Sequence, residues 1–295
     1  MISEVTSADL VALTTDRLAL VVDSGFGGRV TSLTDRATGR EWLMQGPRAD
    51  DVSEAAEYRG AASRGWDECF PTVLSCQNAV WGGRLRDHGM LWGRPWEVVE
   101  VGTQHLEARF QGEGITFNRR LTLKGAVVNA VYAVTSSRAA PVPYLWSQHC
   151  VLSPVKGDQI TFSGLGRMEA EGFQFDWPAY PARDLSRVGH ADEGFNLKAY
   201  GLTAARATAQ IIGQKGGLRF DWDGRDVPAL GLWLDYGSWP AEGPLHQLAI
   251  EPTTGAADDL AGAEAIGQAR WLAPGDTHRW SVMLTLTDPD PRKNA

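Results

Sequence analysis

Two residues, Glu251 and His149, have the side chains of a general base and a general acid and lie at the ends of apolar or aromatic stretches. Glu251 follows the apolar run Leu248-Ala249-Ile250, and His149 follows Trp146-Ser147-Gln148. A carboxylate at the end of a buried strand is costly unless it is paired or used. Both are therefore candidate catalytic residues. A structural ion pair is the alternative for Glu251, and a hydrogen-bonded core histidine is the alternative for His149.

A third candidate, His88, lies in the stretch 84–98, which crowds charged side chains and two tryptophans together without a helix or strand period. Gly93 and Pro95 would break a helix here, so we expect a shaped loop that leads into a strand near Trp96. Loops held by a rigid scaffold often carry binding and catalytic residues. A surface turn in which His88 makes only a local hydrogen bond is the alternative.

Binding residues are suggested by two further charged side chains, Arg64 and Asp192, which also lie at the edges of predicted elements. Twelve tryptophans are the one excess in the composition, and an indole can stack on the apolar face of a pyranose ring. Burial in the core is the alternative for most of them. The candidates for a stacking wall are Trp66, Trp92, Trp96, Trp146 and Trp239.

Alternation of apolar and polar residues predicts β-strands along most of the chain. The expected strands are 18–23, 29–35, 96–101, 106–111, 115–124, 127–135, 141–152, 159–162, 195–204, 207–213, 217–222, 229–236, 245–251 and 278–287. Only 258–267 has a helical pattern, and 177–194 is a long polar loop. Many strands with almost no helix predict one large antiparallel β architecture, with 1–295 as a single domain.

Composition and charge limit the function classes. The 295 residues carry a net charge of −8 without basic blocks, which argues against nucleic acid as a partner. Charged residues interrupt the first 20 positions, so we expect neither a signal peptide nor a membrane anchor. Three cysteines, Cys69, Cys76 and Cys150, do not make a disulfide framework. The expected location is the cytoplasm.

Taken in chain order, these segments resemble the aldose 1-epimerase (galactose mutarotase) family over most of the chain. The matching segments are Arg64-Gly65 before a proline-bearing stretch, Asp87-His88-Gly89 before Trp96, the strand with His149, Asp192-Glu193-Gly194-Phe195-Asn196-Leu197, and the apolar strand that ends at Glu251. The resemblance implies an antiparallel β-supersandwich of the galactose mutarotase-like type, with very little helix. Asp87, Met90 and Cys150 depart from the family's galactose enzymes, which bears on the substrate.

The resemblance also implies an isomerase of carbohydrate metabolism that interconverts the α and β anomers of an aldose. Glu251 would be the base and His149 the acid, on opposite sides of one sugar ring, and His88 would share the charge on the ring oxygen. Arg64 and Asp192 would hold sugar hydroxyls. This chemistry requires no metal or organic cofactor. The expected partner is a monosaccharide, bound by a monomer or homodimer.

Two other functions remain open from the sequence. A non-catalytic sugar-binding module would keep the tryptophans, Arg64 and Asp192 but would not need His149 or Glu251. An epimerase of an anionic, 6-phosphorylated or sulfonated hexose would use an anion pocket built from Arg64, Arg84, Arg86 and Arg94. Four acids in the same loops would neutralise these arginines pairwise, which favours a neutral aldose: Asp67, Glu68, Asp87 and Glu97.

Overall fold

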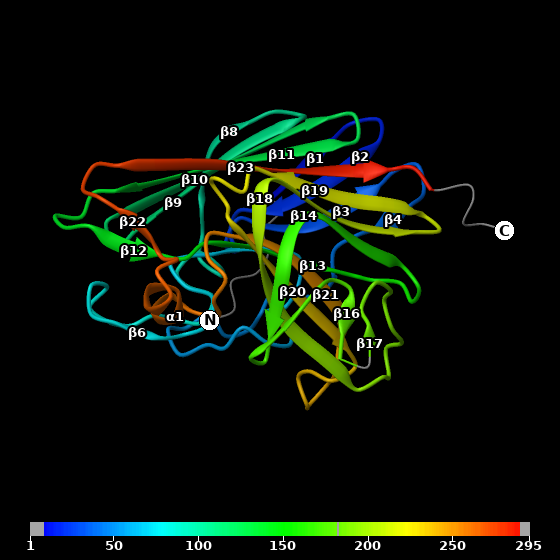
Figure 1. Cartoon of the computed structure of the whole chain (residues 1–295). Coiled ribbons are helices and arrows are strands. Elements are labelled where there is room, and N and C mark those ends of the chain that lie inside the picture. The colour runs from blue at the N-terminus through cyan, green and yellow to red at the C-terminus, as the bar shows by residue number, and fades with distance from the viewer. Residues whose placement is uncertain (1–8, 182, 290–295) are drawn as a thin grey trace.

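The structure is a computed structural model that describes residues 9–181 and 183–289 (Figure 1). Within these residues it contains 23 strands and one short helix. The first strands are β1 (Leu10–Thr14), β2 (Leu18–Asp23), β3 (Arg29–Asp35), β4 (Arg40–Glu41), β5 (Trp66–Cys69), β6 (Gln77–Asn78), β7 (Gly83–Arg84), β8 (Glu97–Val101), β9 (His105–Gly112), β10 (Ile115–Lys124), β11 (Val127–Ser136) and β12 (Val142–Tyr144). The rest are β13 (Ser147–Leu152), β14 (Gln159–Ala170), β15 (Phe173–Phe175), β16 (Ala179–Tyr180), β17 (Arg183–Asp184), β18 (Phe195–Gly213), β19 (Gly216–Trp222), β20 (Ala229–Tyr236), β21 (His246–Thr253), α1 (Leu260–Ala265), β22 (Arg270–Leu272) and β23 (Thr277–Thr287).

Seventeen of these strands join one sheet whose pairings between named strands are antiparallel. The pairings run β8–β9–β10–β11–β23–β19–β18–β20–β21–β13–β5–β3–β2–β1. The first part of β18 pairs with β20 and its last part with β19, so this strand connects two parts of the sheet. In Figure 1, β10, β11 and β23 lie in an upper layer, β20 and β21 lie below, and β14 and β18 run between them. The antiparallel β architecture predicted from the sequence is confirmed.

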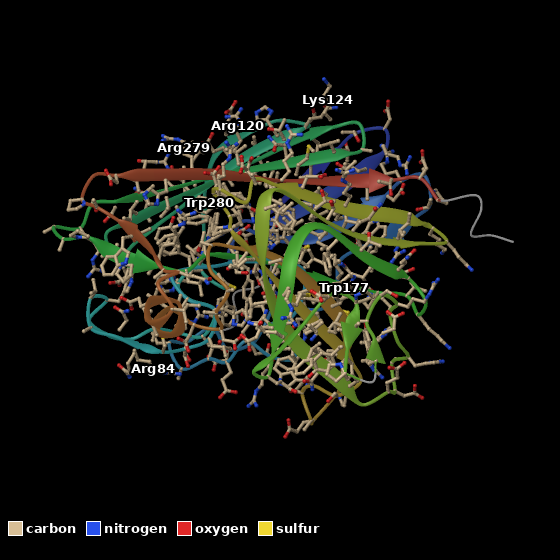
Figure 2. The ribbon with its side chains drawn as sticks, in the orientation of Figure 1. Arg84, Arg120, Lys124, Trp177, Arg279 and Trp280 are labelled. Carbon is tan, nitrogen blue, oxygen red and sulfur yellow. The ribbon has the colours of Figure 1, made fainter. Side chains whose placement is uncertain are left out.

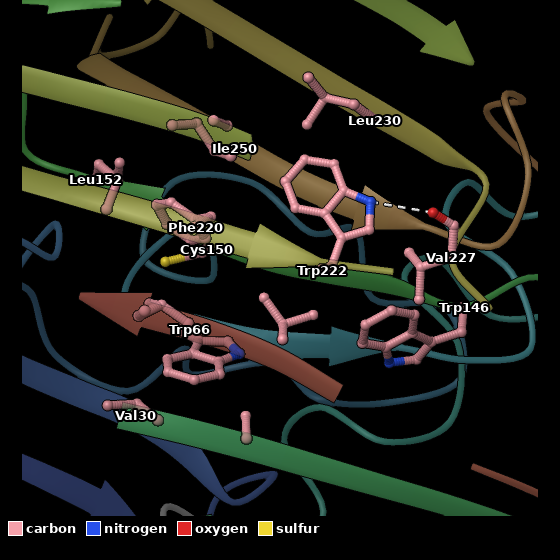
Figure 3. Packing of buried hydrophobic residues seen from close by; sticks show 14 of the residues in the cluster. Val30, Trp66, Trp146, Cys150, Leu152, Phe220, Trp222, Val227, Leu230 and Ile250 are labelled. Atoms are coloured by element: carbon pink, nitrogen blue, oxygen red, sulfur yellow. Dashed lines mark hydrogen bonds between the residues drawn. The ribbon is translucent and has the colours of Figure 1, made fainter. Parts of the chain in front are cut away.

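The core forms where the inward faces of these strands meet, because strand side chains alternate between two faces. In β10, for example, Phe117 and Leu121 are fully buried and Lys124 is exposed. Figure 3 shows Trp66, Trp146 and Trp222 packed among aliphatic side chains of neighbouring strands. Burial of a large apolar side chain contributes about 1.5–3 kcal/mol to stability. The core therefore holds the strands, and the residues at their ends, in place.

Several predicted elements differ from the structure in detail. The expected strand 141–152 is interrupted, because its first part pairs with β22 and its second part with β5 and β21. The expected strands 195–204 and 207–213 are one continuous strand, β18, since β14 pairs with both parts. The helix is shorter than 258–267 and begins after Asp259, whose side chain accepts a hydrogen bond from the Gly262 N–H. No helix within 9–181 and 183–289 is both long and apolar enough to cross a membrane.

Candidate active site

One row of residues crosses five neighbouring strands and contains both the candidate acid and the candidate base. Across β5, β13, β21, β20 and β18 the row consists of Asp67, His149, Glu251, Gly231 and Tyr200. The pairs Ser147–Thr253 and Cys150–Ile250 flank the junction of β13 and β21 and place His149 opposite Glu251. Residues in one row point to the same face of a sheet. The pairing register therefore brings together side chains that are about 100 residues apart in the chain.

Glu251 and His149 are buried neighbours with their reactive atoms close together. His149 Nε2 lies 3.8 Å from Glu251 Oε1, which has no hydrogen-bond partner among the described residues. The other oxygen, Oε2, accepts a hydrogen bond of 2.6 Å from Lys198 Nζ and a longer one from the Ser147 hydroxyl. Burial, and then the nearby His88, Lys198 and Arg29, lower the pKa of His149 well below its usual value. The imidazolium of His149 is therefore a stronger acid than an exposed one.

His88 lies beside this pair and is held by three neighbours. Its Nδ1 is 2.9 Å from Asp87 Oδ1, and its ring stacks on Tyr58 with centroids 3.9 Å apart. Tyr58 in turn donates its hydroxyl to Asp67 Oδ2 at 2.7 Å. The centroids of the His88 and His149 rings are 4.8 Å apart. His88 is thus oriented by side chains on both sides and faces the same space as His149.

The loop that carries His88 depends on Gly89. His88 and Gly89 both have positive φ angles, of 57° and 71°. The Gly89 backbone also pairs with Phe70, and a Cβ on Gly89 would lie 2.0 Å from the Phe70 carbonyl oxygen. Only glycine fits this close approach without strain. The dipeptide His88-Gly89 therefore anchors the loop to the strand region that precedes it.

These side chains open into a cavity of about 390 Å³. This volume lies within the range of small-molecule sites, about 300–1,000 Å³. The cavity combines acids, bases, two cations and an aromatic wall. Its lining consists of Glu57, Tyr58, Arg59, Ser63, Val73, Leu74, Asp87, His88, His149, Lys198, Trp233, Trp239, Glu251 and Asp258.

Of the five tryptophans expected to form a stacking wall, only Trp239 lines this cavity. Trp96 is buried, and its indole donates to the Leu91 carbonyl oxygen. Trp66 and Trp146 are fully buried in the core (Figure 3). Both indoles donate hydrogen bonds to Glu68. Trp92 is also fully buried, and its indole donates to the Asp87 carbonyl oxygen. The interpretation of Trp66, Trp92 and Trp146 as a stacking wall is therefore wrong. Burial of these large apolar rings in the core removes more apolar surface from water than a place in the cavity wall would.

The sequence predicted one shared site for Arg64, His88, His149, Asp192 and Glu251. Only His88, His149 and Glu251 line the cavity. The Asp192 side chain is 90% exposed, lies near His190 and does not line the cavity. Its backbone lies close to Gly237, where an added Cβ would be 3.3 Å from the Asp192 Cα. Arg64 packs against Gly46 and is also absent from the lining. Both predicted hydroxyl-binding roles therefore lack the placement they require.

The expectation that acid and base lie on opposite sides of a sugar ring also needs correction. A separation of 3.8 Å between His149 Nε2 and Glu251 Oε1 leaves no room for a ring between them. The two oxygens that exchange protons in anomer interconversion are both bonded to the anomeric carbon. An acid and a base side by side can therefore reach both oxygens at one edge of the ring.

The four arginines of the motif loops do not build an anion pocket, since none of Arg64, Arg84, Arg86 and Arg94 lines the cavity. Their expected pairing with the four acids of the same loops is also wrong. Asp67 pairs with Arg29 and Glu68 with Arg119. Asp87 contacts His88, and Glu97 pairs with Arg109. Arg84, for its part, lies at the outer lower edge in Figure 2. The buried acids Asp67 and Glu68 thus pair with arginines of other strands, which the loop sequence does not reveal.

Most of the cavity lining was not identified from the sequence, and the missed residues include Lys198, Tyr58 and Trp233. A signal for Lys198 exists, because it occupies the face of β18 opposite the buried Leu197 and Ala199. The alternation alone predicts that the Lys198 side chain faces solvent. Only the adjacent strands β20 and β21 show that this face borders a cavity.

A larger cavity of about 730 Å³ lies elsewhere, between the segments 39–41, 153–159 and 212–215. Its buried pair, Arg40 and Asp158, is joined at 2.5 Å, so these charges are already neutralised. Its lining, among the residues that the structure describes, contains no histidine. The smaller cavity is therefore the better candidate for acid–base chemistry, in spite of its size.

Comparison with solved structures identifies the fold. The Slr1438 protein of Synechocystis sp. PCC 6803 matches 95% of this chain and 96% of its own, with 18% identity and a TM-score of 0.72. A galactose mutarotase related enzyme from Lactobacillus acidophilus matches 95% and 98%, with 15% identity and a TM-score of 0.68. A galactose mutarotase-like protein from Clostridium acetobutylicum matches 95% of each chain, with 12% identity and a TM-score of 0.69. No protein-family model and no curated protein matches the sequence. The chain therefore has the galactose mutarotase-like fold that the sequence resemblance implied.

Proposed function

We propose that the 390 Å³ cavity is the active site of a mutarotase that interconverts the α and β anomers of an aldose. The contact between His149 Nε2 and Glu251 Oε1 is the observation that carries this proposal. An acid and a base 3.8 Å apart suit two oxygens on one carbon. Trp233 and Trp239 supply apolar surface beside them, as a pyranose ring requires.

The proton transfers follow from this arrangement. Glu251 Oε1 removes the proton from the anomeric hydroxyl, and the anomeric carbon–oxygen bond becomes a carbonyl while the bond to the ring oxygen breaks. His149 Nε2 protonates the ring oxygen as it leaves. Rotation about the bond to the neighbouring carbon presents the other face of the aldehyde. As the former ring oxygen attacks that face, His149 Nε2 takes back the proton of this hydroxyl and Glu251 returns its proton to the carbonyl oxygen. His88 would stabilise the charge on the ring oxygen.

A neutral aldose is the proposed substrate class. Arg59 and Lys198 are the two cations that line the cavity, but both contact acids, since Arg59 lies 3.2 Å from Glu57 and Lys198 lies 2.6 Å from Glu251. An anionic sugar would need cations that are not already neutralised. The arginines on which the anionic alternative depended lie outside the cavity.

The proposal is tested by anomer exchange, measured by exchange NMR over a panel of neutral and anionic aldoses. Glu251→Gln removes the base and His149→Asn removes the acid. Each should reduce exchange by about 10²- to 10⁴-fold, the usual contribution of a general acid or base. Sugar binding, followed by tryptophan fluorescence, should persist in both variants.

Lys124→Met is a matched control, because Lys124 lies on the outer upper face in Figure 2. It should exchange anomers at the parent rate. If the parent binds aldoses but exchanges none, the cavity is that of a sugar-binding module. A strong preference for a 6-substituted anionic hexose that fades with added salt would instead identify an anionic substrate.

A further inference from the structure

Lys198 is the cavity residue that makes the shortest contact with the proposed base. Its ammonium lies 2.6 Å from Glu251 Oε2, and the side chain is 22% exposed at the cavity. A charge-assisted hydrogen bond of this length is about twice as strong as a neutral one. Because Oε2 is taken by Lys198, Oε1 is left as the atom that faces His149.

Lys198 reaches Glu251 across an intervening strand, β20, that has no side chain at the crossing point. Gly231 pairs with Glu251 on one side and with Tyr200 on the other. A Cβ on Gly231 would lie 3.1 Å from both Glu251 Oε2 and a Tyr200 ring carbon. The glycine thus leaves the space in which the carboxylate and the ammonium meet. Three strands must be in register for the contact to form.

The ammonium acts on both members of the proposed acid–base pair. It donates a hydrogen bond to Glu251 Oε2, and its charge disfavours the imidazolium of His149. Other titratable groups of the packed strands also interact electrostatically with this carboxylate. They are Cys69 on β5, His149 and Cys150 on β13, and Tyr200 on β18. Lys198 differs from these groups in that it brings an ammonium to the carboxylate.

We propose that Lys198 is a positioning residue that holds Glu251 as an oriented carboxylate with Oε1 alone presented to the substrate. This inference rests on the proposed function for its catalytic consequence, but the contact itself can be tested without activity. Lys198 sets which oxygen acts as the base and at which pH the acid–base pair works. It therefore tunes the site without touching the reacting atoms.

The kinetic test measures kcat/KM for anomer exchange against pH in the parent, Lys198→Met, Lys198→Gln and Lys198→Arg. Loss of the charge should lower the maximum about tenfold or more. It should also move the limb of the pH profile that reports His149 to higher pH, because the imidazolium loses a like charge. Lys198→Arg should restore most of the rate and the parent profile. Lys124→Met is the control and should resemble the parent.

A rate loss in Lys198→Met with an unchanged pH profile would overturn the proposal, since a purely structural defect lowers the rate without moving the limb that reports His149. Urea unfolding tests the contact between Lys198 and Glu251 independently of enzyme activity. Lys198→Met leaves the Glu251 charge buried and unpaired, so adding Glu251→Gln should recover stability in that background. Lys198→Gln serves in the same cycle if Lys198→Met does not fold. Additive effects of the two substitutions would refute the contact, whereas an inactive parent with coupled effects would refute only the proposed function.

Discussion

Glu68 offers a sharp test of the buried network beneath the site. It lies on β5 next to Asp67, is fully buried, and accepts hydrogen bonds from Trp66, Trp146 and Tyr132. Arg119 donates to it as well, at 3.1 Å. Burial outweighs these donors and raises the pKa of Glu68 from 4.5 to about 7. The folded protein thus binds this proton more tightly than the unfolded chain.

The sign and size of the effect follow from that difference. Proton binding by Glu68 stabilises the folded state, so its contribution is fully present below pH 4.5 and is lost as the pH rises to about 7. One pKa unit corresponds to 1.36 kcal/mol, which makes the total loss about 3 kcal/mol. Glu68→Gln keeps the shape of the side chain and removes the titration.

The assay is urea unfolding of the parent and of Glu68→Gln at several pH values between about 5 and 8. The free energy of unfolding of the parent, relative to the variant, should fall by about 3 kcal/mol over the whole titration. Absolute stability of the variant is expected to be lower, because Arg119 loses its ionic partner. Glu242→Gln, at an exposed position, is the control. A constant difference between parent and variant across this pH range would refute the reasoning.

Two further predictions concern cavity residues. The lowered pKa of His149 means that the unfolded chain binds its proton more tightly, so this contribution to stability is lost as the pH falls through about 6.5. His149→Asn should therefore lose less stability than the parent between pH 7.5 and pH 5.5, measured by urea unfolding, and an equal loss would contradict this. Trp239→Ala should raise KM about fivefold, for roughly 1 kcal/mol of lost apolar contact, and leave kcat nearly unchanged. A fall in kcat with unchanged KM would place Trp239 away from the bound sugar.

Local sequence patterns determined the strands and part of the site. The period-2 alternation predicted β10 (Ile115–Lys124) with the observed bounds. It succeeds because a strand's two faces are set by neighbours two residues apart in the chain. Glu251 and His149 stood out for a similar reason, since each is a polar residue at an apolar strand.

Tertiary structure decided which of these side chains meet. Lys198 reads as a surface lysine until β20 is placed beside β18 with Gly231 at the crossing. Trp146 reads as a sugar-stacking residue until the core encloses it, and Asp192 as a binding residue until the fold leaves its side chain exposed. Alternation gives the face of a strand but not the strand beside it. The identity of the neighbouring strand depends on pairing between segments tens to hundreds of residues apart. The ion pairs form between the charged side chains that this pairing buries together.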